Sequence, residues 1–349
     1  MSVEAAFAIP GAIEMRTGGY IYDRRVLELL NANGVRVQHV QLLASWPDPT
    51  PEAEADLARQ LDALPTGMPV ILDGLVLGAM DTALLAQQTR PVIAMLHHPL
   101  GLETGLSPAR VEFLLAREKA NLRHVAHVVV SSQHTREILI DQFEVPAEKL
   151  SIALPGFDRP ASALLREKLE PPLILSVGII CQRKGHDVLL SALDRIKAQD
   201  WQAVIAGRVQ DEGVYNALLA MRADLGLEAR VTFAGELEAD ALSACYHQAS
   251  IFALATRYEG YGMVLSEAQL HGLPVVSCAV GAVPQTVAGG GAILTAPDDP
   301  DAFAAALSKV LQDGTLRENM ARDSRATSAS LPCWQDTAAI MRAAIAAVM

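Results

Sequence analysis

Cysteine is scarce in this sequence, and its few positions are widely separated. The chain has four cysteines among 349 residues. They form neither a CxxC pair nor a group with histidine, which disfavours a zinc ribbon, a redox CxxC motif and a disulfide-stapled fold. We therefore expect a cytoplasmic protein with reduced thiols at Cys181, Cys245, Cys278 and Cys333.

Long hydrophobic runs are also missing. No segment approaches the ~20 apolar residues that a membrane-spanning helix needs. The start of the chain, MSVEAAFAIP, lacks the basic region and the long apolar core of a signal peptide. A peripheral membrane contact stays open, although the sequence offers no basic amphipathic helix to support it.

Positive charge is in the minority. Lys and Arg number 28 against 40 Asp and Glu, which gives a net charge of −12. A broad nucleic-acid footprint needs clustered cations that displace phosphate counterions, so nucleic acid is not an expected partner. The chain also lacks a proper GxGxxG fingerprint and a GxxxxGK[ST] loop. These absences disfavour a dehydrogenase and a P-loop enzyme.

Aromatic residues make up only 5% of the chain, whereas apolar residues reach 51%. This balance, rich in Ala, Leu and Val, suits α/β layers better than a sandwich of aromatic-rich strands. Short apolar runs alternate with longer amphipathic stretches, which is the pattern of βαβ units. A length of 349 residues is sufficient for two such domains. We therefore predict two doubly wound, Rossmann-like parallel sheets.

The expected strands fall into two series of six. The first series comprises residues 4–9, 35–43, 69–73, 92–97, 125–131 and 150–154. The second comprises residues 173–179, 202–206, 230–234, 250–255, 274–279 and 292–295.

The most informative segment is TRYEGYGMVLSEAQLHGLPVVSCAVGAVPQ, which holds Glu259 and Glu267 around a Gly-Tyr-Gly turn. Gly260 and Gly262 permit backbone conformations closed to other residues and leave room for a ligand. Residues 263–270 are predicted to form a short helix, whose N-terminus makes an anion site suited to a diphosphate. Glu259 is expected at the mouth of that site. Glu267 is expected deeper, where its carboxylate can accept two hydrogen bonds from a ribose.

This two-glutamate spacing resembles the signature of the retaining glycosyltransferases of family 4, the group 1 glycosyl transferases, which have the GT-B fold. The segment SVGIICQRKGHDVLLSAL at residues 176–193 is similar to the other donor-domain motif of that family. The resemblance covers roughly residues 128 to 325 well and the N-terminal part more loosely. It implies two Rossmann-like domains facing a cleft, with a nucleotide sugar and an unknown acceptor as binding partners.

A proline-bearing stretch divides the two series of strands and predicts the domain boundaries. The N-terminal, acceptor-side domain is expected at residues 1–155, the linker at 156–172 and the C-terminal, nucleotide-sugar-binding domain at 173–330. Residues 331–349 are expected to include a terminal helix that packs back on the N-terminal domain, as the resemblance implies.

A basic pair, Arg183 and Lys184, follows a predicted strand and emerges where open α/β sheets bind ligands. By resemblance, both are catalytic residues that neutralise the leaving diphosphate. The alternative is a solvated pair, but a positive charge is poorly placed at a helix start unless an anion offsets it. Many family members carry an arginine where this chain has Ile179, and Arg183 is the candidate to take over that role.

The resemblance also assigns the residues around the glycine turn. Glu259 would contact hydroxyls of the donor sugar as a catalytic residue, and Glu267 would contact the ribose. The rest of the donor site is expected at Gly260, Tyr261, Gly262, Met263 and Val264, with backbone contacts to phosphate. Tyr261 and Met263 have packing of the turn as their alternative role. The base pocket is expected around Leu237, in a loop that does not distinguish uridine from guanosine.

Two motifs of the first domain complete the expected site. Gly18 and Gly19 stand after the opening strand and ahead of a predicted helix, where the family places a glycine pair against the donor phosphates. A plain strand-to-helix turn is the alternative. By resemblance, His97 is the catalytic histidine near the reacting sugar, with His98 as the alternative. Acceptor-side residues are expected to be Arg16, His98 and Glu103.

The DxD spelling at Asp299 and Asp301 matches the metal motif of the other major glycosyltransferase fold. We interpret it instead as helix capping, because acids favour a first helical turn and DAFAAAL follows. No other group of carboxylates and histidines has metal-ligand spacing in the sequence. We therefore predict transfer without a metal ion or other cofactor.

The sequence predicts a retaining, metal-independent glycosyltransferase that moves a sugar from a nucleoside-diphosphate sugar to an acceptor hydroxyl. Two alternatives remain open. One is a nucleotide-sugar epimerase of the same fold, which needs general acids and bases around the sugar. The other is a non-catalytic relative that keeps the nucleotide-sugar pocket, a reading to which Ile179 lends slight support.

Overall fold

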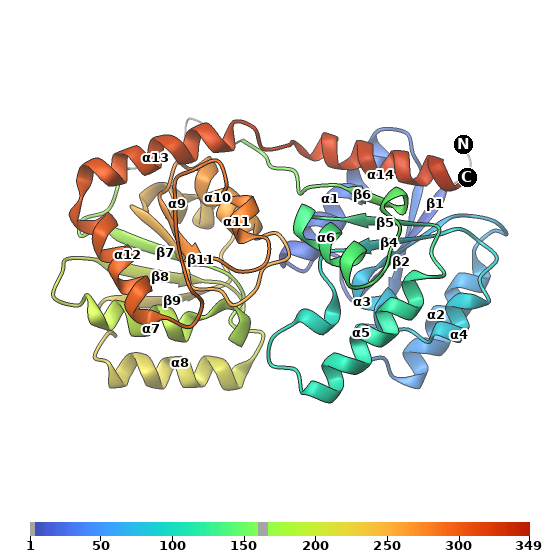
Figure 1. Cartoon of the computed structure of the whole chain (residues 1–349), viewed down its shortest axis with the longest axis horizontal. Coiled ribbons are helices and arrows are strands. Elements are labelled where there is room, and N and C mark those ends of the chain that lie inside the picture. Colours follow the sequence, from blue (N-terminus) through green and yellow to red (C-terminus); the bar gives the residue numbers. More distant parts are fainter. Residues whose placement is uncertain (1–3, 160–166) are drawn as a thin grey trace. The chain divides into compact units, whose positions relative to one another are not determined.

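The computed structural model describes residues 4–159 and 167–349. Within these residues, twelve strands form two six-stranded sheets (Figure 1). All strand pairs are parallel, and every predicted strand is present with ends that differ by a few residues. The expected fold of two doubly wound parallel sheets is therefore confirmed.

The first sheet has the strand order β2-β1-β3-β4-β5-β6. Its strands are β1 (Ala5–Pro10), β2 (Val37–Leu42), β3 (Val70–Asp73), β4 (Val92–Leu96), β5 (His127–Val130) and β6 (Leu150–Ile152). The associated helices are α1 (Gly18–Ala32), α2 (Pro51–Ala63), α3 (Gly74–Leu77), α4 (Thr82–Ala86), η1 (Leu100–Leu102), α5 (Pro108–Leu122), α6 (Gln133–Asp141), η2 (Ala147–Lys149) and α14 (Trp334–Val348).

The second sheet has the strand order β12-β11-β10-β7-β8-β9. Its strands are β7 (Leu173–Val177), β8 (Gln202–Ala206), β9 (Val231–Gly235), β10 (Ile251–Leu254), β11 (Val275–Cys278) and β12 (Ala292–Thr295). The associated helices are η4 (Gln182–Lys184), α7 (His186–Arg195), α8 (Glu212–Asp224), α9 (Ala239–Gln248), α10 (Met263–Leu270), α11 (Val283–Thr286), α12 (Pro300–Gln312) and α13 (Gly314–Ser328).

The chain divides into two compact units. The first holds the residues up to Phe157 together with Pro332 to Met349, and the second runs from Asp158 to Leu331. Within the first unit α14 lies along α1, where the Trp334 ring meets the Tyr22 ring edge-on at 5.9 Å (Figure 1). Part of the predicted linker at 156–172, namely residues 160–166, lies outside the described residues.

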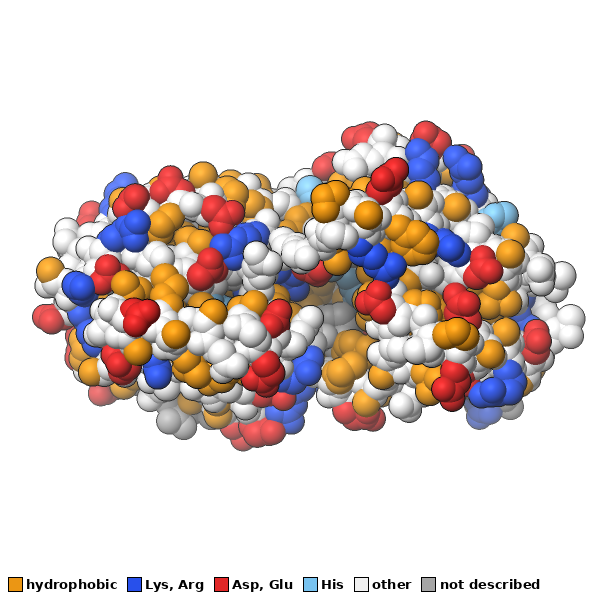
Figure 2. Space-filling view, turned by 90° about the horizontal axis from the view of Figure 1, so that it is seen from below, with side chains coloured by type: hydrophobic (Ala, Val, Ile, Leu, Met, Phe, Trp, Pro, Cys, Tyr) orange, Lys and Arg blue, Asp and Glu red, His pale blue; other side chains and the backbone are white. Residues whose placement is uncertain are grey.

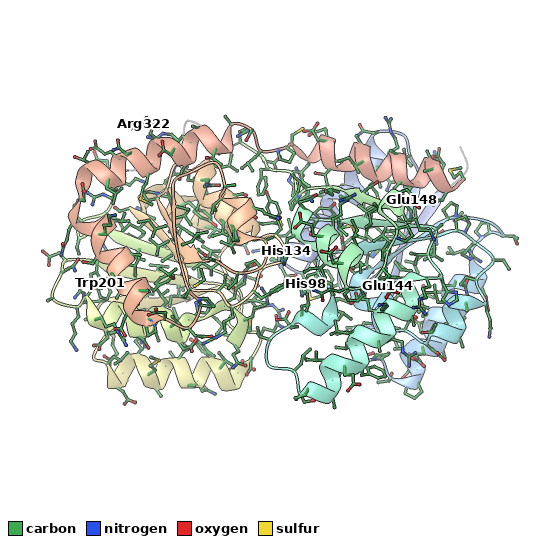
Figure 3. All side chains as sticks on the ribbon, in the orientation of Figure 1. His98, His134, Glu144, Glu148, Trp201 and Arg322 are labelled. Carbon is green, nitrogen blue, oxygen red and sulfur yellow. The ribbon has the colours of Figure 1, made fainter. Side chains whose placement is uncertain are left out.

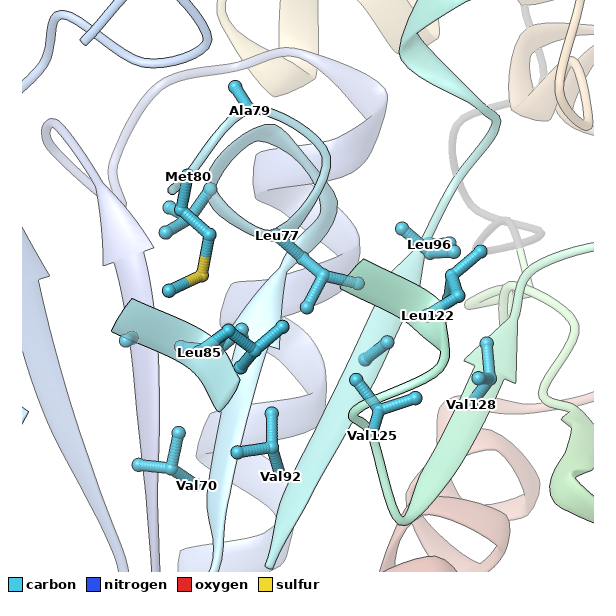
Figure 4. Close-up of a cluster of buried hydrophobic side chains, with 14 of the residues drawn as sticks. Val70, Leu77, Ala79, Met80, Leu85, Val92, Leu96, Leu122, Val125 and Val128 are labelled. Carbon is cyan, nitrogen blue, oxygen red and sulfur yellow. The ribbon is translucent and has the colours of Figure 1, made fainter. Parts of the chain in front are cut away.

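Both faces of each sheet are buried because helices cover them, which explains why the strands are almost continuously apolar. In β10, Ile251 and Ala253 pack toward α7 and α12, whereas Phe252 and Leu254 pack toward α9 and α10. One face of the first sheet builds a similar core with side chains from α2 to α5 (Figure 4). The hydrophobic cores on these sheet faces hold the strand ends, and the loops that follow them, in place.

The charged side chains, the helices and the cysteines can each be compared with what the composition predicts. On the face that Figure 2 shows, Lys and Arg side chains are interspersed with Asp and Glu side chains over each unit. None of the described helices combines the length and the hydrophobicity needed to cross a bilayer. All four cysteines are free thiols, as their spacing predicts.

Candidate functional site

The loop after β7 packs directly against the chain that follows β10. It makes one turn of 3₁₀ helix at Gln182–Lys184 and reaches α7 through Gly185. Gly185 has a φ of 64°, and a Cβ atom there would lie 1.9 Å from the carbonyl oxygen of Ala255. Only glycine allows this contact, which brings the basic pair beside the segment that carries Glu259.

The basic pair and Glu259 form a buried ion cluster. Lys184 Nζ lies 2.7 Å from Glu259 Oε1, and Arg183 Nη1 lies 3.6 Å from the same oxygen. The side chains of Lys184 and Glu259 are only 9% and 6% exposed. The hydroxyl of Thr256 is a further neighbour, 2.9 Å from Glu259 Oε1. Two cations surround one carboxylate, so the cluster keeps a net positive charge.

Electrostatics keeps Glu259 ionised. Burial raises the pKa of the Glu259 carboxyl. The positive charges of Lys184 and Arg183, together with hydrogen bonds from Lys184 and Thr256, outweigh burial and leave this pKa below its ordinary value. The expectation that Glu259 stands at the mouth of the site and Glu267 deeper is not met, because Glu259 is the more buried of the two. Sequence spacing could not show that a lysine 75 residues away neutralises it.

The glycine turn leads into α10 with the predicted bounds, Met263–Leu270. Gly262 is the N-cap of this helix and has a φ of 88°, in the left-handed region. A second glycine, Gly281, packs against the same turn, because a Cβ atom there would lie 2.3 Å from the Glu259 carbonyl oxygen. The same oxygen accepts a hydrogen bond of 2.9 Å from the Ala282 amide. The first N–H groups of α10, at Met263 and Val264, have no partner within the helix and remain available to an anion.

Glu267 projects from α10 toward α9. Its Oε2 atom accepts a hydrogen bond of 2.8 Å from the hydroxyl of Tyr246. Burial raises the pKa of the Glu267 carboxyl, and the Tyr246 hydroxyl and Lys184 only partly offset this effect. One carboxylate oxygen is therefore committed inside the protein, so a ligand hydroxyl would be received mainly by Oε1.

The other residues expected at the donor site have mixed positions. Tyr261 is 9% exposed, its hydroxyl lies 3.2 Å from Ser266 Oγ, and its carbonyl accepts from Thr286, so its side chain packs the turn. Gly260 is buried within the same turn, whereas Met263 and Val264 are partly exposed at the start of α10. Leu237 is partly exposed in the loop that joins β9 to α9, at the carboxyl end of the sheet.

Arg183 lies beside Lys184, and its replacement of the arginine expected at Ile179 stays a prediction. Its Nη1 atom donates to the Tyr258 carbonyl at 3.2 Å and faces Glu259. Ile179 itself is partly buried between Gly178 and Ile180, where the chain runs beside Arg208. The positive charge of this loop therefore comes from Arg183 and Lys184.

The DxD residues act as predicted for a helix start. Asp299 is the N-cap of α12 and accepts a hydrogen bond of 2.9 Å from the Ala302 amide, while Asp301 pairs with Arg195. The capping interpretation of Asp299 is confirmed.

Replacement of Asp299 by Ala tests this capping role. We expect a loss of about 1 kcal/mol in the free energy of unfolding, because one amide of the first turn of α12 loses its acceptor. Donor binding should not change, because capping involves no ligand. The checks are urea denaturation and nucleotide titration, and a stable variant that no longer binds nucleotide would contradict capping as the sole role.

In the first unit, the glycine pair and His97 lie together. α1 begins at Gly18, so both glycines belong to its first turn rather than to a turn ahead of the helix. A Cβ at Gly19 would lie 3.1 Å from His97 Cδ2, so glycine allows the ring to approach α1 closely. The carbonyl of His97 accepts hydrogen bonds from Ser131 and Thr135, each at 3.2 Å.

Two buried aspartates that the sequence analysis missed flank His97. Asp23 on α1 is 1% exposed, and Asp73 at the end of β3 is 4% exposed. The Oδ1 atom of Asp23 lies 3.2 Å from His97 Nε2, and ligand-type atoms of all three residues fall within 4.8 Å of one another. An Asp on the apolar face of a helix and an Asp that ends a wholly apolar strand are the signals that could have found them.

The expected acceptor-side residues are only partly brought together. His98 Nε2 and Glu103 Oε2 approach to 3.5 Å at the carboxyl end of the first sheet, where Figure 3 labels His98. Arg16 is exposed in the loop between β1 and α1.

A comparison with protein families matches the unit that holds the ion cluster. Residues 161–327 match the family model of the group 1 glycosyl transferases. This stretch includes the basic pair, the glycine turn and both glutamates. The match supports the resemblance that the same motifs suggested.

A curated relative of this chain is also a glycosyltransferase. The chain is 29% identical over 230 residues to the D-inositol 3-phosphate glycosyltransferase of Xylanimonas cellulosilytica, which covers 61% of this chain and 55% of the relative. The chain spans about half the length of the first curated relatives it matches, between 43% and 55%.

Solved structures extend the likeness to the whole fold. Sucrose-phosphate synthase from Thermosynechococcus elongatus gives a TM-score of 0.81 at 21% identity, covering 98% of this chain and 100% of that one. Anabaena HepE in complex with UDP and glucose gives 0.76 at 17% identity, covering 98% and 100%. Two parallel six-stranded sheets with these neighbours establish the GT-B fold of glycosyltransferases.

Proposed function

We propose that this protein is a cytoplasmic, retaining glycosyltransferase of family 4 that uses a nucleoside-diphosphate sugar and no metal ion. The observation that carries the proposal is the buried cluster of Arg183, Lys184 and Glu259 beside the N-terminus of α10. It lies within the residues that match the group 1 glycosyl transferases.

The cluster suits a leaving diphosphate. Lys184 and Arg183 both lie within 4 Å of the single Glu259 carboxylate, so this loop brings two positive charges to the site. The N-terminus of α10 adds free N–H groups and a partial positive charge. Both favour the negative charge that develops on the diphosphate as the glycosidic bond breaks, which is the work that a metal ion does in other transferases.

The two glutamates have separable tasks in this account. Glu259 is held rigidly by Lys184, Thr256 and the backbone of Ala282, which suits a carboxylate that orients hydroxyls of the donor sugar. Glu267 keeps Oε1 for the ribose while Tyr246 fixes Oε2. The acceptor is assigned to the first unit, at the residues that follow its strands, with His97 near the reacting sugar. Leu237 is assigned to the base.

Donor turnover tests the proposal. The protein, dialysed against EDTA, would be incubated with UDP-, GDP- and ADP-sugars, with and without a mixture of candidate acceptor sugars. We expect one donor to release its nucleoside diphosphate, faster with acceptor, and the NMR spectrum to show a first-formed product with the donor's anomeric configuration. Inversion would exclude the retaining mechanism, recovery of activity only with added metal would exclude metal independence, and turnover without acceptor dependence would favour an epimerase or hydrolase.

A further inference from the structure

Asp23, Asp73 and His97 come from three different elements and meet inside the first unit. Asp23 is on the first turns of α1, Asp73 ends β3, and His97 follows β4. The His97 side chain is 23% exposed, and that of Asp23 is 2% exposed. The histidine therefore covers the two aspartates on the side where the strands end.

The ring of His97 is held on several sides. Nε2 lies 3.2 Å from Asp23 Oδ1, and the Tyr22 ring packs edge-on at 5.1 Å. Tyr22 is in turn fixed by a hydrogen bond of 2.8 Å from its hydroxyl to the Ala153 carbonyl. Among the described residues, Nδ1 has no hydrogen-bond partner, so it is the ring nitrogen left for a ligand.

Asp23 and Asp73 are the ionisable groups that act on this ring. Ser131 and Thr135, from α6 and its preceding loop, donate their hydroxyls to the His97 carbonyl, and burial raises the pKa of the Tyr22 phenol so that it stays neutral. His98, next in the chain, is directed to Glu103.

We propose that these three residues form one proton-sharing network, in which Asp73 is a neutral acid, Asp23 is a carboxylate and His97 is an imidazolium. Asp23 and Asp73 are then positioning residues that fix His97 as a charged hydrogen-bond donor toward a ligand at Nδ1. The identification of this ligand as a sugar rests on the proposed function, whereas the protonation states of the three residues do not depend on it.

The packing of the two carboxyls favours a proton on one of them. Asp23 and Asp73 are both buried, and one oxygen of each lies within 4.8 Å of the other and of a His97 ring nitrogen. Two carboxylate charges this close would repel each other, and a proton on one of them removes the repulsion. Oδ1 of Asp73 already accepts the Leu75 amide at 2.9 Å, as the N-cap of α3. Asp23 is the carboxyl that pairs with His97, at 3.2 Å, so the proton is assigned to Asp73. Burial, followed by the charge of Asp23, raises the pKa of Asp73 well above its ordinary value, which agrees with this assignment.

The same geometry sets the pH dependence. Burial alone would lower the pKa of His97, but the Asp23 carboxylate outweighs it and leaves the pKa above the ordinary 6.5. Because the folded pKa is raised, the ion pair stabilises the unit fully below the unfolded value of 6.5. That stabilisation, and the charge on Nδ1–H, are lost as the pH rises through the folded pKa.

The test is an NMR titration of histidine rings in the ¹⁵N-labelled full chain, with the His97 signals assigned by their loss in His97→Gln. The two aspartates are compared as matched variants, Asp23→Asn and Asp73→Asn. Asn at position 73 can still accept the Leu75 amide and donate to Asp23, as the neutral acid does. We expect Asp23→Asn to lower the pKa of His97 by about one unit or more, and Asp73→Asn to change it far less.

Equal and large effects of the two substitutions would overturn the proposal, because Asp73 would then be charged. A metal site would also overturn it, and would show as broadening of the His97 signals by substoichiometric Mn²⁺ that both variants abolish. Urea denaturation identifies a variant that fails to fold, in which case Asp23→Ser and Asp73→Ser replace the pair. None of these readouts needs turnover, so the result is independent of the proposed function.

Discussion

Lys184→Met is expected to lower the free energy of unfolding of the second unit by about 3 kcal/mol and to abolish binding of a nucleoside diphosphate. In the wild type, Lys184 Nζ lies 2.7 Å from Glu259 Oε1 and is the closest counter-ion of this carboxylate. The substitution keeps most of the apolar volume of the lysine side chain but leaves the carboxylate buried without that counter-ion. Arg183, at 3.6 Å, would turn toward Glu259 and would no longer be available to phosphate.

The chain offers a matched control in Lys197. Its ammonium also lies 2.7 Å from a carboxylate, that of Asp194, but the lysine side chain is 60% exposed. Lys197→Met should therefore cost less than about 1 kcal/mol, because exposed pairs are screened by solvent. Urea denaturation of both variants isolates the contribution of burial, and similar losses in the two would contradict the account.

A double variant separates the ion pair from general packing. In Lys184→Met, adding Glu259→Gln should recover about 1.5 kcal/mol or more, because the uncompensated charge is removed. The advantage of the wild type over Lys184→Met should hold at neutral pH. It should fade as the pH falls through the lowered pKa of Glu259, since protonation then removes the charge that Lys184 balances.

Gly185→Ala is expected to disrupt the same site through the backbone. The new Cβ would lie 1.9 Å from the Ala255 carbonyl oxygen, so the loop after β7 must move away from the chain after β10. We expect a loss of about 3 kcal/mol or more in the free energy of unfolding, and nucleotide affinity at least 10-fold weaker, because Arg183 and Lys184 move with the loop.

Gly226→Ala is the control for backbone strain. Gly226 has a φ of 66°, almost the 64° of Gly185, but a Cβ there would meet nothing within 4 Å. Its cost should be about 1 kcal/mol, the ordinary penalty of a left-handed alanine, with nucleotide binding unchanged. If the two alanine variants proved equally stable and equally able to bind, the tight packing of the two loops would not matter.

Elements were predictable from the sequence because each depends on a local pattern. The strands are short apolar runs, and helix α10 begins where Gly262 ends the turn and stops before Gly272. The cap of α12 by Asp299 follows from residue type and position alone. Strand ends shifted by a few residues, because the pairing partner, rather than the pattern, decides where a strand stops.

Pairings between distant residues were not predictable. Lys184 meets Glu259 across 75 positions, and His97 meets Asp23 across 74. The sequence places each residue at a strand end or on a helix, but only the packing of several elements decides which side chains touch. For this reason Glu259 was expected at the surface of its site and is instead enclosed by Lys184 and Arg183.

The most direct test of the donor site is thermal stability with UDP, GDP, ADP and their common sugars, each with and without EDTA. A ligand at 100 times its dissociation constant stabilises a protein by about 2.7 kcal/mol. The account predicts that one nucleoside diphosphate raises the melting midpoint, equally with EDTA, and that Glu267→Ala but not the exposed Glu318→Ala weakens this rise. If no nucleotide shifted the midpoint, or if Glu267→Ala responded like wild type, the donor site assigned to the second unit would be contradicted.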